Sequence, residues 1–251
     1  MIQDLAAGIE MSIPKILHYC WFGNSEFPKR EQKCINSWKK YLSDFEMRCW
    51  NEENFDVQCN PYVREAYQVR RYEFVSDYCR LLALYNEGGL YLDTDCLVKK
   101  DFTPLMIGGK AFTGYGGDNY ELAAHALAFP PKHPFIKECL ESYDGERFLK
   151  EDGSYNKYTI NQRMTNLLKN HGFIPNGRMQ EICNIIIYPM TYFCPISMLP
   201  DTVRDCKSKN TYCIHVWSSK ELKRERNFLI RFAHKTGLNK IKRKLIEVIK
   251  K

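Results

Sequence analysis

Two aspartates separated by a single residue are the polar feature of this sequence best suited to chemistry. Asp93 and Asp95 lie in the stretch GGLYLDTDCLV, after a short apolar run that predicts a buried strand. Side chains alternate along a strand, so both carboxylates should converge on one face together with Tyr91. Such a pair stays ionised only beside a cation, and its oxygens suit Mg²⁺ or Mn²⁺ that also bind a diphosphate. The alternative is a pair of solvated aspartates in a turn.

A second pair of charged residues lies on the segment that leads into this strand. Asp77 and Arg80 are three residues apart in FVSDYCRLLALYNE, which predicts a helix, so they share one helical face near the strand end. An arginine at that place could hold a phosphate with two parallel hydrogen bonds, or lock Asp77 in position. The simpler interpretation is an ion pair on the helix surface.

The order of predicted elements indicates where these residues lie in the fold. Strands are expected at 15–22, 46–51, 90–98, 110–115, 122–130, 182–193 and 211–217, and helices at 30–42, 62–87, 134–143 and 160–172. The helix at 62–87 can be one helix or two with a break near Arg71. Asn60 and Pro61 suit its start and Gly88 its end. The alternation predicts an α/β fold, an open mixed sheet with helices on both faces.

The stretch from Phe74 to Asp95 resembles the signature of glycosyltransferase family 32, the sugar-binding region with a D-x-D motif. The family includes bacterial capsule and lipopolysaccharide transferases and fungal initiating mannosyltransferases. The pattern S-D-x-x-R followed by G-G-x-Y-x-D-x-D is also similar to the core of the large clostridial glucosylating toxins. The segment IPKILHYCWFG resembles the opening strand of the family, so the resemblance covers most of residues 13–102. It implies a GT-A-type fold and a nucleotide-diphosphate sugar as donor.

The resemblance also implies roles for residues on the donor side. Trp21 matches the tryptophan that stacks on the donor base in this family. Such a stacking contact is worth about 1–3 kcal/mol. The alternative is that Trp21 only packs in the hydrophobic core. Asp77 and Arg80 match residues that contact the donor sugar and its neighbouring phosphate. Tyr91 matches the tyrosine beside the ribose.

The resemblance assigns different parts to the two aspartates. Asp93 matches the aspartate that binds ribose or sugar hydroxyls and reaches the metal through water, and Asp95 matches the direct metal ligand. A divalent ion on Asp95, helped by Arg80, would stabilise charge on the departing phosphate. Asp95, Asp93 and Arg80 are therefore the expected catalytic residues, with Mn²⁺ or Mg²⁺ as cofactor.

The C-terminal part of the pattern departs from the family. Members commonly carry a histidine and, a few residues later, a Ser-Trp pair near the metal, whereas YCIHVWSSKEL has the order Trp-Ser-Ser. His215 is expected near the metal or the diphosphate, unless it is an ordinary histidine at a strand end. Trp217, Ser218 and Ser219 are all candidates for the diphosphate contact.

The acceptor side and the stereochemistry are less constrained by the sequence. Asp118, Glu121 and His125 fall in YGGDNYELAAHALAF, where the acceptor should bind, although each could be a surface-loop residue. The resemblance implies retention of anomeric configuration. No nucleophile stands out, which fits attack by the acceptor from the side of the leaving group.

Composition sets limits on compartment and partners. The 251 residues suit one medium α/β domain, and no apolar run approaches the ~20 residues of a membrane-spanning helix. Residues 1–11 read as a loose leader, not a secretory signal. The 11 cysteines contain no C-x-x-C pair, which favours reduced core cysteines in a cytoplasmic protein over a zinc site.

The surplus of positive over negative charge lies at the end of the chain. The whole chain has a net charge of +7, whereas residues 220–251 hold 12 Lys and Arg against 3 Glu. This distribution disfavours a nucleic-acid-binding domain. We expect a catalytic domain at 1–219 and a basic amphipathic helical appendage at 220–251. The appendage suits either the anionic inner face of the cytoplasmic membrane, beside a lipid-linked acceptor, or the surface of its own domain.

Together these features predict a metal-dependent, retaining glycosyltransferase that moves a sugar onto an oligosaccharide or lipid-linked glycan in cell-surface polysaccharide biosynthesis. One alternative is a noncatalytic module that binds a nucleotide sugar or a membrane. Another is a phosphatase of the haloacid dehalogenase type, which would need its D-x-D motif early in the chain and followed by Gly-Thr, whereas Cys96 and Leu97 follow here.

Overall fold

The computed structural model describes residues 12–116, 120–196 and 207–216. The predicted leader at 1–11 and the predicted basic appendage at 220–251 lie outside these residues, so the division into a domain and an appendage stays a prediction. Among the described residues, no helix is long and apolar enough to cross a membrane.

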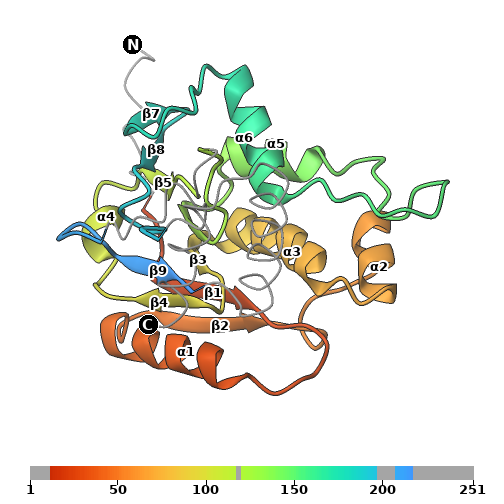
Figure 1. The fold of residues 1–251 in the computed structure, drawn as a ribbon, viewed down its shortest axis with the longest axis horizontal. Coiled ribbons are helices and arrows are strands. Elements are labelled where there is room, and N and C mark those ends of the chain that lie inside the picture. The colour runs from red at the N-terminus through yellow and green to blue at the C-terminus, as the bar shows by residue number, and fades with distance from the viewer. Residues whose placement is uncertain (1–11, 117–119, 197–206, 217–251) are drawn as a thin grey trace, which may run out of the picture.

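A mixed seven-stranded sheet forms the centre of the molecule (Figure 1). Its strands lie in the order β2-β1-β3-β6-β5-β8-β7. The pairs β1–β2, β1–β3 and β5–β8 are parallel, and β3–β6, β5–β6 and β7–β8 are antiparallel. The bounds are β1 Ile16–Cys20, β2 Glu46–Trp50, β3 Gly89–Leu92, β5 Ala111–Gly114, β6 Ala126–Phe129, β7 Gln180–Ile182 and β8 Ile185–Tyr188.

A second, two-stranded sheet pairs β4 (Cys96–Val98) with β9 (Cys213–His215) in antiparallel fashion. The last strand of the described chain thus lies beside the strand that follows the two aspartates. This pairing joins segments that are far apart in the sequence, and it has direct consequences for the site described below.

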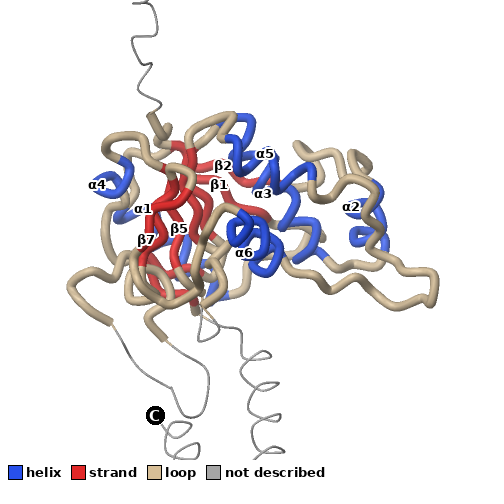
Figure 2. Tube along the Cα trace, turned by 90° about the horizontal axis from the view of Figure 1, so that it is seen from above, coloured by secondary structure: helices blue, strands red, loops and turns tan. Residues whose placement is uncertain are grey.

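Helices cover both faces of the large sheet, as the alternation of elements predicts. Figure 2 shows the strands as a central layer with α3, α5 and α6 on one side and α4 on the other. The core is accordingly in two parts: one contains residues of α2, α3, α5 and α6, and the other contains residues of α1, α4 and the small sheet. The bounds are α1 Lys29–Tyr41, α2 Pro61–Gln68, α3 Tyr72–Glu87, α4 Thr103–Met106, α5 Pro134–Glu141 and α6 Ile160–Asn170.

The expected helix between Pro61 and Gly88 is two helices, one of the two possibilities read from the sequence. Asn60 caps α2 because its side chain accepts a hydrogen bond from the Tyr62 N–H at 2.8 Å. The chain breaks at Arg70, whose φ of 58° lies in the left-handed region, and α3 starts at Tyr72. This break separates the short α2 from the helix that carries Asp77 and Arg80.

Two consecutive glycines connect α3 to β3 because side chains would not fit there. Gly88 and Gly89 have φ values of 66° and 113°. A Cβ on Gly89 would stand 2.6 Å from the carbonyl oxygen of Ile16 in β1, and one on Gly88 would stand 2.6 Å from Pro131. The close approach lets α3 pass directly into β3 and fixes the start of the segment that ends in Asp93.

His18 ties this connection to the neighbouring strands. Its Nε2 lies 2.8 Å from the carbonyl oxygen of Gly88, and its Nδ1 accepts a hydrogen bond from the Trp50 indole N–H at 3.1 Å. The ring is fully buried. Burial lowers the pKa of His18 from 6.5 to about 4, although the Gly88 carbonyl acts in the opposite direction. The neutral ring is the form that satisfies both neighbours.

This arrangement predicts a loss of stability in mild acid. Below pH 6.5 the unfolded chain takes up a proton on His18 that the folded chain refuses until about pH 4. The free energy of unfolding should therefore fall as the pH drops from 6.5 to 4, with a contribution from His18 on the order of 3 kcal/mol. Urea unfolding at several pH values measures it. In His18→Gln, whose amide can donate and accept but does not titrate, this part of the pH dependence should disappear; an unchanged pH profile would contradict the assignment.

Cysteines are used as small core residues, as the composition predicts. The ten cysteines within the described residues are free, and seven of them are buried: Cys20, Cys34, Cys79, Cys96, Cys139, Cys194 and Cys213. Burial raises the pKa of Cys139 above its usual range, so this thiol stays protonated and unreactive.

Candidate active site

The candidate site lies at the edge of the sheet where two parallel strands end. β1 and β3 are neighbours in the sheet and run in the same direction. Trp21 directly follows β1, and Asp93 follows β3. Ligands of open α/β sheets bind outside the carboxyl ends of the strands, which is where these residues stand.

The two aspartates are in a turn, and the prediction of a single strand through 90–98 is wrong. β3 ends at Leu92 and β4 begins at Cys96. The Cys96 N–H donates to the Asp93 carbonyl oxygen at 2.9 Å and closes the turn. The chain bends here because β4 leaves the large sheet and pairs with β9. The carboxylates converge as expected, but the turn brings them together and not the alternation of a strand.

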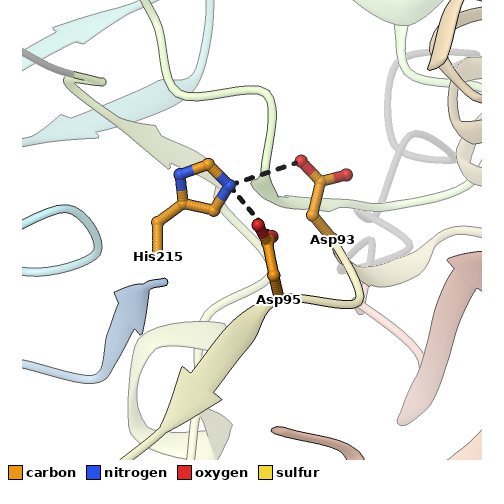
Figure 3. A group of neighbouring side chains, drawn as sticks. All are labelled: Asp93, Asp95 and His215. Carbon is orange, nitrogen blue, oxygen red and sulfur yellow. Dashed lines mark ion pairs between the residues drawn. The ribbon is translucent and has the colours of Figure 1, made fainter. Parts of the chain in front are cut away.

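His215 completes a cluster with the two aspartates (Figure 3). Its Nε2 lies 3.0 Å from Oδ1 of Asp95 and 4.0 Å from Oδ2 of Asp93. In the small sheet His215 pairs with Cys96, and the Val216 N–H donates to the Asp95 carbonyl oxygen at 2.8 Å. One potential ligand atom from each of the three residues lies within 4.8 Å of the others. His215 therefore lies beside the two aspartates, and its contact with a metal or a diphosphate stays a prediction.

This donor set fits a divalent cation. Two carboxylates offer hard oxygen ligands and an imidazole offers one nitrogen, a combination suited to Mn²⁺ and less to Mg²⁺, which prefers oxygen alone. Burial alone would raise the pKa of Asp95, but the charge and hydrogen bond of His215, together with Arg30, outweigh it and hold that pKa below its usual value. Asp95 is therefore ionised and ready to bind a cation at neutral pH.

Arg80 lies behind the aspartates and is fully engaged with protein acceptors. Its Nη1 donates to the Ala124 carbonyl oxygen at 2.8 Å and lies 3.2 Å from Oδ1 of Asp93, while Nη2 lies 3.0 Å from Oδ1 of Asp77. The guanidinium also packs over the Tyr91 ring at 4.5 Å. Arg80 is 5% exposed. Asp77 and Arg80 thus form a buried network that includes Asp93, and not a pair on the helix surface.

Asp77 is the carboxylate of this network whose pKa is raised by burial. Burial raises its pKa to about 6, Arg80 acts to lower it, and Asp93 adds to the increase. Its Oδ2 also accepts a hydrogen bond from the Ile160 N–H, at the start of α6, at 3.3 Å. Asp77 therefore joins α3 to α6 beside the site.

The expected contact between Tyr91 and the aspartates is a hydrogen bond. The Tyr91 hydroxyl donates to Oδ1 of Asp93 at 2.9 Å, and the ring is buried. Asp93 is thereby held by both Tyr91 and Arg80 and keeps its other oxygen toward His215.

Sequence reasoning missed Arg30. This residue lies in the first turn of α1, and its Nη2 is 3.8 Å from Oδ2 of Asp95. Its Nε also donates to Glu31 at 3.0 Å. Neither spacing nor composition links Arg30 to Asp95, because only the packing of α1 beside β4 brings them together.

Trp21 stands half-buried at the end of β1. Its indole N–H donates to the Ser25 carbonyl oxygen at 2.6 Å, and its ring lies 4.6 Å from that of Phe27. The aromatic pair offers a partly exposed surface at the edge where the donor is expected. Stacking of a base on Trp21 stays a prediction.

The three residues expected on the acceptor side have different environments. Asp118 lies outside the described residues. Glu121 lines a pocket of about 310 Å³ together with polar residues of α6 and its approach; the lining is Glu121, Tyr158, Gln162, Thr165, Asn166, Lys169 and Pro175. His125 is 5% exposed and packs against His215, so it lies beneath the cluster. Trp217, Ser218 and Ser219 also fall outside the described residues.

Comparison with known proteins points to one class of enzyme. Residues 28–112 match a family described as "Glycosyltransferase sugar-binding region containing DXD motif". Inositol phosphoceramide mannosyltransferase 1 of Schizosaccharomyces pombe is 25% identical over 158 residues, which cover 56% of this chain and 46% of the relative. The chain thus spans less than half the length of this relative.

Solved structures of low sequence identity are also similar. The PaToxG glycosyltransferase has a TM-score of 0.45 and 18% identity, with 63% of this chain and 70% of that chain covered. A galactosyltransferase, LgtC, solved with donor and acceptor sugar analogues, has a TM-score of 0.44 and 16% identity, with 81% and 87% covered.

Proposed function

We propose that this chain, whose residues 28–112 match a glycosyltransferase sugar-binding region containing the DXD motif, is a metal-dependent glycosyltransferase of the GT-A type. The donor is a nucleotide-diphosphate sugar. The observation that carries the proposal is the convergence of Asp93, Asp95 and His215 at the edge of the sheet. The two aspartates lie inside the matched region, and His215 is far beyond it in the sequence. The mannosyltransferase relative makes a mannosyl donor the first to test.

The chain's own residues suggest how the cation would be held. Asp95 and His215 face each other at 3.0 Å and are its direct ligands in this proposal, with Asp93 as the third. When bound, Mn²⁺ or Mg²⁺ would act as a Lewis acid on the diphosphate. Tyr91 and Arg80 fix Asp93 from behind, so the carboxylates do not need to reorient when the donor arrives.

Arg80 serves in this proposal mainly by holding other residues. Its guanidinium hydrogen bonds go to Ser76, Ala124, Asp77 and Asp93. In this proposal the positive charge of Arg80 also helps to stabilise the negative charge that develops on the departing phosphate. In this proposal Asp77, which is tied to both Arg80 and Ile160, accepts a further hydrogen bond from a sugar hydroxyl of the donor.

Retention of the anomeric configuration of the sugar fits the contacts that the clustered carboxylates make with other side chains. Asp93 and Asp95 face His215, and Asp77 is bound to Arg80, so each has a role other than attack on the sugar. Attack by the acceptor hydroxyl from the side of the leaving group needs no enzyme nucleophile. The pocket beside Glu121 is the place we propose for the acceptor, a cell-surface oligosaccharide or lipid-linked glycan.

A donor screen tests the proposal. The full chain, freed of metal, is incubated with UDP- and GDP-sugars, and release of the nucleotide diphosphate is measured with and without Mn²⁺. We expect one donor to be hydrolysed, with activity lost in EDTA and restored by Mn²⁺. Donor binding without any hydrolysis or transfer would instead indicate a noncatalytic module. Phosphate release from simple phosphoesters would indicate a phosphatase.

A further inference from the structure

A second histidine, His125, stacks flat against His215. The rings of His125 and His215 are 4.4 Å apart between centroids, and their planes differ by only 5°. His215 is the last residue of β9, whereas His125 directly precedes β6 of the large sheet. The stack is thus a contact between the two sheets at the point where the cluster forms.

His125 is held by hydrogen bonds to its backbone carbonyl and by burial of its side chain. Its carbonyl oxygen accepts hydrogen bonds from the Asp93 N–H at 3.1 Å and from the Cys96 thiol at 3.4 Å. Its ring lies beside the backbone of Phe193, which is fully buried. Its Nε2 is buried and has no hydrogen-bond partner among the described residues.

His215, by contrast, is carried on a strand of three residues at the edge of a two-stranded sheet. The strand fixes its backbone, but not the rotation of its ring. A flat ring packed on one side restricts that rotation and leaves Nε2 facing Asp95 and Asp93 (Figure 3). Groups that orient a metal ligand without touching the metal commonly change metal affinity by about 10- to 100-fold.

We propose that His125 is a positioning residue, which stacks on His215 and holds its Nε2 toward the two carboxylates, so that the divalent-cation site is formed before the cation binds. The inference rests on the proposed function for the existence of that site. His125 supports the turn through its carbonyl and β9 through its ring, and so fixes both parts of the cluster relative to each other. The flat face of the His125 ring, and not one of its nitrogens, is what restricts the rotation of the His215 ring.

Mn²⁺ binding to the metal-free full chain tests this without any enzyme assay. His125→Ala removes the stacked ring and should weaken Mn²⁺ about 10-fold, measured by calorimetry or by the electron paramagnetic resonance of free Mn²⁺. His125→Phe restores a flat ring without nitrogen and should stay within about 3-fold of the wild type. His125→Leu, which fills the space without a plane, should bind like His125→Ala and decides the matter if the alanine variant does not fold.

A matched control separates positioning from general damage. His133 is also a buried histidine, and its side chain accepts a hydrogen bond from the Phe135 N–H at the start of α5, outside the cluster. His133→Ala should unfold more easily but bind Mn²⁺ like the wild type at a temperature where circular dichroism shows every variant folded.

Each other result has a defined meaning. Equal Mn²⁺ affinity in His125→Ala and the wild type would overturn the positioning role alone. Equal weakening in His125→Phe and His125→Ala would overturn it too, because a ring nitrogen would then be responsible. A wild-type chain that does not bind Mn²⁺ would overturn both this inference and the proposed metal site, whereas the donor screen tests the activity separately.

Discussion

Replacing Asp95 with asparagine is expected to lower Mn²⁺-dependent donor hydrolysis by about 1000-fold while the chain remains folded. The amide keeps the size of the side chain but removes the charge that faces His215 at 3.0 Å. His215 and Arg30 hold the pKa of Asp95 below its usual value despite burial, so Asp95 is ionised at neutral pH. The measurement is the rate of nucleotide diphosphate release at saturating donor and Mn²⁺.

The matching control is an aspartate with a purely local role. Asp152 accepts hydrogen bonds from the backbone and hydroxyl of Ser154 in an exposed turn. Asp152→Asn should hydrolyse the donor like the wild type. If Asp95→Asn retained near-normal activity with an unchanged Mn²⁺ dependence, Asp95 would not be a metal ligand, and the proposed mechanism would be wrong.

The second large effect is expected on stability. Arg80→Met removes the cation between Asp77 and Asp93, together with the packing of the guanidinium on Tyr91. Breaking a buried ion pair by deleting one partner leaves an uncompensated charge and costs about 3–5 kcal/mol. We expect the midpoint of urea unfolding to fall accordingly, and donor hydrolysis to be lost as Asp93 moves away from Tyr91.

A double variant shows whether the orphaned charge is the cause. Arg80→Met combined with Asp77→Asn removes both charges of the Asp77–Arg80 pair. The loss in the free energy of unfolding of this double variant should be smaller than the sum of the losses in the two single variants. Lys137→Met, which breaks an exposed pair with Glu141, should unfold like the wild type. An Arg80→Met chain as stable as the wild type would contradict the buried network.

Local signals in the sequence predicted the helical segments at 30–42, 62–87, 134–143 and 160–172 and the pairing of Asp77 with Arg80, but not the short α4. Asn60 caps α2 as its position before Pro61 predicts, and the break near Arg71 is present. Asp77 and Arg80 are on one helical face because three residues make almost one turn. Each of these features depends on residues within a few positions of one another.

The features that the sequence could not predict depend on distant contacts. The turn at 93–95 exists because β9 pairs with β4, and nothing near Asp93 records that pairing. The apolar stretch 182–193, expected to be one strand, supplies part of a hairpin in which Cys183 and Asn184 have φ values of 52° and 61°. Arg30 and His125 join the cluster in the same way, through the packing of α1 and β6.

The small sheet joins parts of the site that are far apart in the sequence. Asp93 and Asp95 are inside residues 28–112, but His125 and His215 come after that region, so the cluster is complete only when β9 has paired with β4. Closing so long a loop costs entropy before any contact is gained. In the proposed metal site, a divalent ion held by Asp95 and His215 would join β4 to β9, so Mn²⁺ binding should raise the free energy of unfolding of the chain as well as support activity.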